Sequence, residues 1–184
     1  TYSEDVDTKE NDAVKENDAV EKDENMGKVS ASYALMAGSY VFSSGAGGWE
    51  TEVDVAEDGT FSGQYTYFAA GDCDTDYPDG TVHICNFKGK FTDMQQVDAY
   101  SYSMRLDYLE AEGREGELYF EDNMRYIYST PYGFEGADKF MFYLPGMRMS
   151  SLPVGFVDWC RAFFNVEHVD ELPYRGIYNI TGEY

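Results

Sequence analysis

The sequence predicts an all-β domain of mainly antiparallel strands, closed into a β-barrel and carrying one late α-helix. Three observations predict it. Apolar and polar residues alternate with a period of two from residue 39 onward, turn residues separate the alternating segments, and 17% of the 184 residues are aromatic. Short strands at this spacing favour a closed or nearly closed barrel, and a β-sandwich is the alternative architecture.

The first predicted hairpin is the clearest local pattern. Residues 49–55 alternate apolar with acidic side chains, and residues 61–67 restart the alternation. Between them, residues 57–60 read Glu-Asp-Gly-Thr, a turn in which glycine accepts a positive φ. The two segments are therefore expected to pair as antiparallel strands.

A second hairpin is predicted around residues 72–80, leading into a strand over residues 82–91. Its turn is Tyr-Pro-Asp-Gly at residues 77–80, where proline presets the φ of the second position. Residues 100–108 then alternate again up to the glycines at 113 and 116. Further strands are expected at residues 117–121, 124–128, 139–144 and 174–180.

The late helix is expected to begin at Ser151-Leu152-Pro153, with serine as its cap and proline in its first turn. Apolar residues then recur nearly all round the segment up to Phe164, with Asp158 and Arg161 as its charged residues. Such a helix should be covered on most sides. We therefore expect it to plug or flank the sheet.

Residues 1–28 are predicted to form a disordered acidic spacer, and residues 29–184 a single β-rich domain. The spacer contains the hexapeptide Lys-Glu-Asn-Asp-Ala-Val twice in tandem, at residues 9–20, and few apolar residues. A transient helix is the alternative for this segment. The uncharged run 29–49 contains five serines and four glycines, so it is not expected to span a membrane.

The formal net charge of −22 excludes one class of partner. Such a negative surface repels phosphate backbones and anionic headgroups, so nucleic-acid binding is excluded and membrane contact is expected only through a lipid anchor. The chain opens Thr-Tyr-Ser-Glu-Asp, without the basic and apolar regions of a signal peptide. A monomer that binds an unknown small molecule, peptide or glycan is expected.

Tyrosines are the candidate ligand-binding residues. In a barrel the tyrosine-rich faces point inward or line the mouth, and a buried tyrosine hydroxyl needs a polar partner. The candidates are Tyr65, Tyr67, Tyr102, Tyr126, Tyr128 and Tyr143. Two alternatives remain open: the aromatics of residues 126–143 form a carbohydrate-recognition platform, or they simply fill the core.

Cysteines and a group of aspartates suggest two further features. Cys73 and Cys85 lie six residues either side of Asp79, so a hairpin symmetrical about that turn would bring them opposite each other for a disulfide; two unpaired thiols are the alternative. Asp72, Asp74 and Asp76 are weak candidates for ligands of a metal ion. They start like a calcium loop, but Tyr77 replaces its glycine and His83 its glutamate.

No catalytic constellation is found, and no cofactor is expected. The glycine-rich residues 43–48 lack the lysine of a phosphate loop, and no nucleophile-elbow sequence occurs. Acids at Glu110, Glu112, Glu115 and Glu117 leave a carboxylate-dependent hydrolase as a minor alternative. A non-enzymatic function is therefore expected.

Several segments carry a resemblance to a known family. The segments are 38–49 (Gly-Ser-Tyr-Val-Phe-Ser-Ser-Gly-Ala-Gly-Gly-Trp), 58–63, 77–82, 86–91, 126–127, 131–133, 143–146 and 150–153. They resemble a family of uncharacterised surface lipoproteins of Gram-positive gut bacteria, over residues 37–180. Gly38-Ser39-Tyr40 is also similar to the Gly-x-Trp start of lipocalins, with tyrosine in the tryptophan place, which implies a lipocalin-like barrel.

The resemblance implies export, attachment to lipid at an upstream cysteine, and a spacer role for the acidic tail; it implies no known activity. Combined with the tyrosine-rich strands, it leads us to expect an extracytoplasmic, membrane-tethered domain. We expect that domain to bind a small or extended ligand in its barrel.

Overall fold

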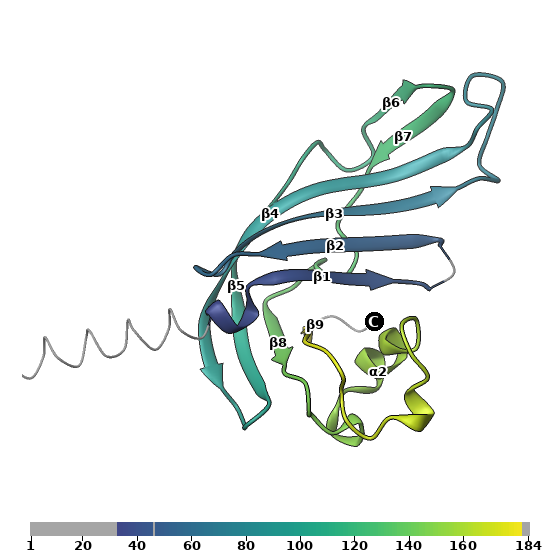
Figure 1. The fold of residues 1–184 in the computed structure, drawn as a ribbon. Coiled ribbons are helices and arrows are strands. Elements are labelled where there is room, and N and C mark those ends of the chain that lie inside the picture. Colours follow the sequence, from purple (N-terminus) through teal and green to yellow (C-terminus); the bar gives the residue numbers. More distant parts are fainter. Residues whose placement is uncertain (1–32, 46, 182–184) are drawn as a thin grey trace, which may run out of the picture.

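The computed structural model describes residues 33–45 and 47–181, and one twisted nine-stranded sheet dominates it (Figure 1). The predicted spacer, residues 1–28, lies outside the described residues. The strands are β1 (Gly38–Ser43), β2 (Trp49–Val55), β3 (Thr60–Ala69), β4 (Thr81–Gln96), β5 (Ser101–Ala111), β6 (Leu118–Glu121), β7 (Met124–Tyr128), β8 (Lys139–Tyr143) and β9 (Gly176–Asn179). The helical segments are η1 (Met149–Ser151), α2 (Val154–Cys160) and η2 (Val166–His168), and residues 33–36 form a helical turn.

Seven strands run along the sheet in the order β1-β2-β3-β4-β5-β8-β9, and every neighbouring pair is antiparallel. The sheet bends round until β1 and β9 approach one another, so the predicted antiparallel β-barrel is confirmed as a nearly closed one. Because strand direction alternates along an odd number of strands, β1 and β9 run in the same direction. They do not pair within the described residues, which leaves a seam between them.

One end of the sheet projects beyond the barrel (Figure 1). There the first residues of β4 pair with β7 in parallel, and β6 pairs with β7 as a hairpin. The later residues of β4 pair instead with β5, across register shifts at Lys90/Phe91 and Thr92/Gln95. Such irregularities bend a strand, so β4 belongs to the projecting arm at one end and to the barrel at the other.

The β3–β4 register corrects the predicted second hairpin. β3 continues to Ala69, which pairs with Thr81, so that the hairpin is centred near residue 75 and not on the turn at Asp79. In this register Cys85 lies opposite Tyr65. Cys73 lies in the connecting loop, and the predicted pairing of Cys73 with Cys85 does not form: both cysteines are free.

The interior of the barrel is filled by a packed cluster of aromatic and aliphatic side chains. Phe134, in the loop before β8, lies at its centre and is only 1% exposed. Its ring contacts those of Phe42, Phe61, Phe87 and Phe140, with centroids 5.1–6.4 Å apart. Two cross-strand pairs of glycine and phenylalanine, Gly63 with Phe87 and Phe61 with Gly89, let these rings lie over the bare backbone.

A second cluster joins α2 to the outer side of β8 and β9. Phe156 of α2 packs against Tyr143 and Tyr178, at ring centroid distances of 5.1 and 5.7 Å. The helix flanks the sheet as expected, but the predicted start and end are wrong. It begins at Val154 after Pro153, because Ser151 belongs to η1 and does not cap it, and it ends at Cys160 and not at Phe164. After Cys160 the amides of residues 161–163 donate to carbonyls three residues earlier, which tightens the chain into turns. These turns bring Phe163 and Phe164 against Tyr174.

Candidate functional site

A cavity lined mainly by aromatic and apolar side chains lies at the seam between β1 and β9, beside α2. We call this cavity, of about 390 Å³, the seam groove. It is within the size range of pockets that hold small organic ligands. Fourteen residues line it: Ser39, Tyr40, Val41 and Phe42 of β1; Phe156, Trp159, Cys160, Phe163 and Phe164 of α2 and the following turns; and Pro173, Tyr174, Arg175, Gly176 and Ile177 before and within β9.

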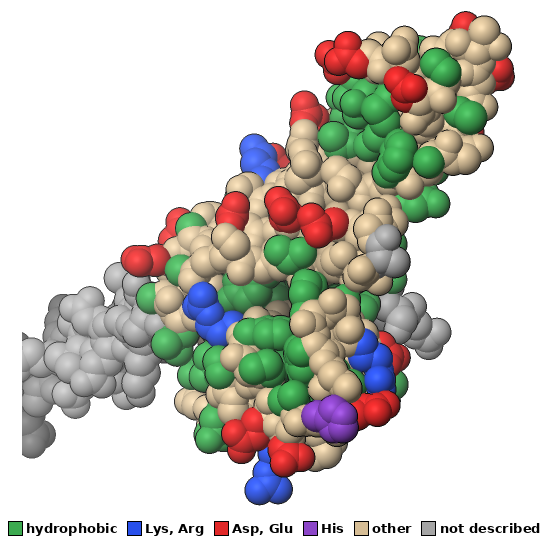
Figure 2. Space-filling model, turned by 45° about the vertical axis from the view of Figure 1, so that its right-hand side comes forward, with side chains coloured by type: hydrophobic (Ala, Val, Ile, Leu, Met, Phe, Trp, Pro, Cys, Tyr) green, Lys and Arg blue, Asp and Glu red, His purple; other side chains and the backbone are tan. Residues whose placement is uncertain are grey.

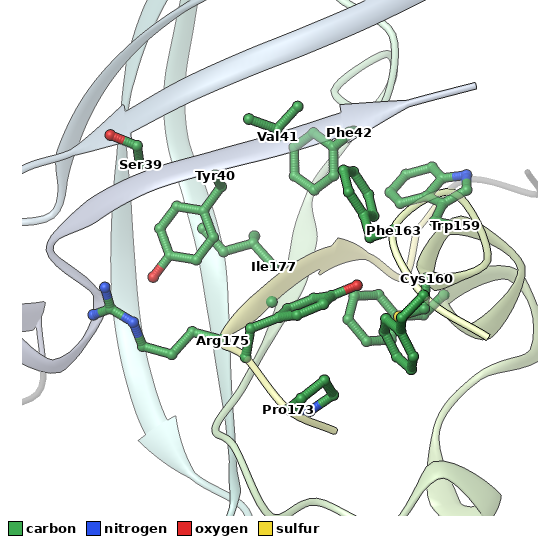
Figure 3. A pocket seen from close by; sticks show the side chains of 14 residues that line it. Ser39, Tyr40, Val41, Phe42, Trp159, Cys160, Phe163, Pro173, Arg175 and Ile177 are labelled. Carbon is green, nitrogen blue, oxygen red and sulfur yellow. The ribbon is translucent and has the colours of Figure 1, made fainter. Parts of the chain in front are cut away.

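The walls of the seam groove are aromatic rings held by their neighbours. Phe42 and Trp159 contact one another across the seam with centroids 5.2 Å apart, and Tyr174 lies 5.5 Å from Phe164. Figure 3 shows Phe163 and Trp159 at one end of the groove. Phe163 is 48% exposed, so its ring forms part of the open rim.

The opposite end of the seam groove is polar. Arg175 and the hydroxyl of Tyr40 lie side by side there (Figure 3). Nη1 of Arg175 donates to the carbonyl oxygens of Leu35 and Ala37 at 2.7 and 3.1 Å, and the Tyr40 hydroxyl donates to the carbonyl of Met36 at 2.5 Å. Burial raises the pKa of Tyr40 to about 12, although the Arg175 charge opposes the rise. Tyr40 therefore stays neutral.

Cys160 belongs to the wall and not to a nucleophilic site. It is 2% exposed, and burial raises the pKa of its thiol, despite a hydrogen bond with the Tyr174 hydroxyl that acts in the other direction. Burial and the same contact also raise the pKa of Tyr174. Both groups are thus protonated at neutral pH, and a protonated thiol is a poor nucleophile.

The structure distributes the six candidate tyrosines over separate places. Tyr102 and Tyr143 are buried in the two hydrophobic clusters, and burial raises the pKa of Tyr143 to about 12. Tyr65 packs against the barrel core, and the ring of Tyr67 lies tilted against that of His83, with centroids 5.5 Å apart. Tyr126 and Tyr128 lie on the projecting arm, both in contact with Tyr119. They line no common site, and none of the six lines the seam groove.

The arm carries exposed hydrophobic side chains. Figure 2 shows that such side chains cover much of the face of the arm turned to the viewer, with acidic groups around them. Leu118 and Phe120 of β6 are 48% and 54% exposed, and the ring of Phe120 lies 5.8 Å from that of Tyr77.

The three candidate metal ligands lie in the exposed loop between β3 and β4. Asp72 forms an ion pair with Arg125, and Asp74 accepts a hydrogen bond from the amide of Thr75. Across the part of the chain that the structure describes, no three His, Cys, Asp or Glu side chains are grouped to hold a metal ion. Asp72 and Asp74 therefore already have partners within the protein.

The acids considered for a hydrolase lie at the end of β5 and in the loop after it. Glu110 forms an ion pair with Lys88 at 3.0 Å, and Glu112 accepts a hydrogen bond from Asn86 at 2.7 Å. Glu110 and Glu112 lie beside a depression that also contains Ser62 and Phe87, and Glu115 and Glu117 are exposed. The Glu110 and Glu112 side chains therefore already have partners on the surface of the sheet.

The three thiols are expected to differ sharply in reactivity. Cys73 is exposed, whereas Cys85 is fully buried, and burial together with Glu112 and Glu135 raises its pKa to about 11. At pH 8, Ellman's reagent should therefore label one thiol per chain rapidly, and three in denaturant. A single reactive thiol in denaturant would instead reveal a disulfide and contradict the structure. The Cys73→Ser variant, which should lose the rapid phase, identifies the reactive group.

Sequence reasoning missed the residues that form the polar end of the groove, above all Arg175. A signal was available for the apolar wall of the groove, because segment 154–164 is apolar nearly all round, but none pointed to Arg175. The rings of this segment line the seam groove, so its composition already indicated a surface in need of an apolar partner.

No family model, curated protein or solved structure matches this chain. The structure supports a barrel-like fold, and neither the structure nor the comparisons support the resemblance to the surface lipoprotein family. Among the described helices, none has the length and apolar character needed to cross a bilayer.

Proposed function

We propose that this protein is a non-enzymatic binding protein whose seam groove holds a small or extended apolar ligand. One observation carries the proposal: the interior of the barrel is filled by phenylalanine rings, while an open cavity of about 390 Å³ lined by aromatic side chains lies at the seam. An apolar cavity with few polar groups is the usual form of a small-molecule site. The ligand is thus bound outside the closed interior, in contrast to the tyrosine-lined barrel expected from the sequence.

We further propose that the domain is extracytoplasmic, a cell-surface lipoprotein tethered through residues 1–28 and monomeric. The acidic, low-complexity composition of residues 1–28 and the resemblance to surface lipoproteins support this proposal. Protease treatment of intact cells that produce the natural protein tests it. Digestion of the domain while a cytoplasmic marker survives is expected, and complete protection of the domain would contradict it.

The ligand site is tested with the neutral fluorescent probe N-phenyl-1-naphthylamine and the variant Phe163→Ala. Phe163 is 48% exposed, so its loss should leave the fold intact and remove part of the groove wall. Removing about 50 Å² of apolar contact costs about 1.2 kcal/mol, which is a loss of affinity of about eightfold. A fluorescence titration measures it.

The matched control is Phe120→Ala, the same substitution at a ring that is 54% exposed on the distant arm. Probe affinity should be unchanged in this variant. If both variants bind like the natural chain, or the natural chain binds no apolar probe, the proposed function is wrong.

A second candidate function, carbohydrate recognition, is favoured by the exposed aromatic surface of the arm. Phe120 and Tyr67, 54% and 39% exposed, could stack on the apolar faces of sugar rings. The same two variants separate the functions. If affinity electrophoresis in polysaccharide gels retards the chain, and Phe120→Ala but not Phe163→Ala abolishes the retardation, the arm is the binding surface.

A further inference from the structure

The seam groove has two chemically different ends, and this asymmetry limits what it can bind. Along most of its length the walls are rings and aliphatic carbon. At the end of the groove beside the start of β1, the exposed guanidinium of Arg175 lies next to the neutral hydroxyl of Tyr40 (Figure 3). A ligand that fits the whole groove must therefore be apolar along its length and polar at one end.

Among the described residues, Arg175 has no acidic partner. None of the ion pairs among residues 33–45 and 47–181 involves it, in a chain with 35 acidic and 13 basic residues. Its hydrogen bonds within the described residues, to the Leu35 and Ala37 carbonyls, both use Nη1. A guanidinium has five N–H donors, so Nε and Nη2 have no hydrogen-bond partner among those residues.

We propose that the seam groove binds a single-chain amphiphile with a carboxylate head, such as a medium-chain fatty acid. This inference rests on the proposed function and names the ligand class. The alkyl chain lies along the rings of Phe42, Phe163 and Tyr174, and the head accepts hydrogen bonds from Arg175. A charge-assisted pair of guanidinium and carboxylate is stronger than a neutral hydrogen bond.

The strands that border the groove argue against an extended peptide as the ligand. A peptide that closed the barrel would need the free backbone edges of both β1 and β9. All four residues of β9 are buried, with Ile177 at 0% exposure, so an added strand would have to displace the side chains packed around β9. The cavity thus fits a narrow chain that needs no backbone pairing.

The net charge of −22 does not prevent an anionic head from binding. Exposed charges are screened beyond a Debye length of about 8 Å at physiological ionic strength. The head meets Arg175 directly, at the rim of an apolar wall where the local dielectric constant is lower than in water. The charge of Arg175, and not the net charge of the chain, therefore decides which ligand head group the groove prefers.

The experiment compares decanoate with 1-decanol at pH 8 and measures binding below their aggregation concentrations by displacement of N-phenyl-1-naphthylamine. The two ligands share the chain and differ in the head. Decanoate is expected to bind at least tenfold more tightly than decanol. In Arg175→Met the decanoate affinity should fall about 10- to 100-fold towards that of decanol, while Arg175→Lys should retain part of the preference.

Because Arg175 also bonds the carbonyls beside the helical turn, its loss can loosen the end of the groove. Such a structural effect would weaken both ligands equally, so the ratio of the two affinities isolates the charge. Arg105→Met is the matched control, since Arg105 pairs with Asp138 away from the groove, and it should leave the ratio unchanged.

Three outcomes are distinguishable. A decanoate preference that disappears in Arg175→Met supports the inference. Equal binding of decanoate and decanol by the natural chain overturns it and leaves the proposed apolar site standing. Failure of both ligands and of the probe to bind overturns the inference and the proposed function together.

Discussion

Replacing Phe134 with alanine is expected to lower the free energy of unfolding by about 3–5 kcal/mol, the usual cost of removing a buried phenylalanine. The ring is 1% exposed and forms contacts with residues of β1, β3, β4 and β8 at once. Its loss removes these contacts and leaves a void in the barrel that the surrounding strands cannot close. Since whole domains are stable by about 5–15 kcal/mol, this is a large fraction of the total.

Urea unfolding followed by circular dichroism measures the effect as a shift of the midpoint. The control is Phe68→Ala, because Phe68 lies on β3 but is 46% exposed, and it should cost less than about 1 kcal/mol. The slope of the transition should be unchanged in both variants. A cost for Phe134→Ala as small as that of the control would mean that the interior is not packed as described.

The Phe134→Ala variant also tests whether the ligand site is the seam groove or the barrel interior. An apolar void left by a deleted ring can take up a small apolar molecule. Benzene is therefore expected to raise the stability of Phe134→Ala and not that of the natural chain. The naphthylamine probe, whose site is the seam groove, should bind both proteins with similar affinity. If the variant lost the probe instead, the ligand site would be the interior.

Local alternation was sufficient to predict individual strands. Trp49–Val55 and Met124–Tyr128 have the bounds predicted from the sequence, because each has turn or break residues directly at its ends. The barrel architecture followed from the number and spacing of such segments. What local patterns could not give is which distant strands meet, such as the parallel pairing of β7 with the start of β4.

The error in the second hairpin has a simple physical origin. The Tyr-Pro-Asp-Gly turn at residues 77–80 suggested a tight centre, but β3 extends to Ala69, which pairs with Thr81, so the turn lies within a longer connection over residues 70–80. The predicted and observed partners of Cys85, Cys73 and Tyr65, differ by an even number of residues, so both registers keep the same side chains on the core face. The alternation alone therefore could not distinguish the two registers.

The seam groove shows why the candidate site could not be predicted from local sequence patterns. Its walls come from residues 39–42 and from residues 156–177, which no local pattern connects. The composition of the late helix indicated an apolar excess, yet the position of Arg175 opposite β1 depends on the bending of the whole sheet. The tyrosines, chosen as candidates for their number, lie instead in the two hydrophobic clusters and on the arm.

Replacing Gly89 with alanine is expected to destabilise the protein by about 3 kcal/mol, at the upper end of what overpacking a core usually costs. A Cβ atom there would lie 2.4 Å from Cζ of Phe61 and 2.5 Å from the carbonyl oxygen of Tyr108. The ring could rotate away, but the carbonyl belongs to the backbone of β5. Relief thus requires β4 and β5 to separate where the sheet bends into the barrel.

Gly71→Ala is the matched control. Gly71 has no contact within 4 Å for an added Cβ and does not have a positive φ, so alanine should be neutral or stabilise slightly by restricting the unfolded chain. Thermal unfolding of both variants measures the difference. The double variant Gly89→Ala with Phe61→Ala separates the two clashes: if the ring is the main obstacle, the two costs will be less than additive. Additive costs would mean that the β5 carbonyl dominates and that Gly89 is required for the close approach of the strands themselves.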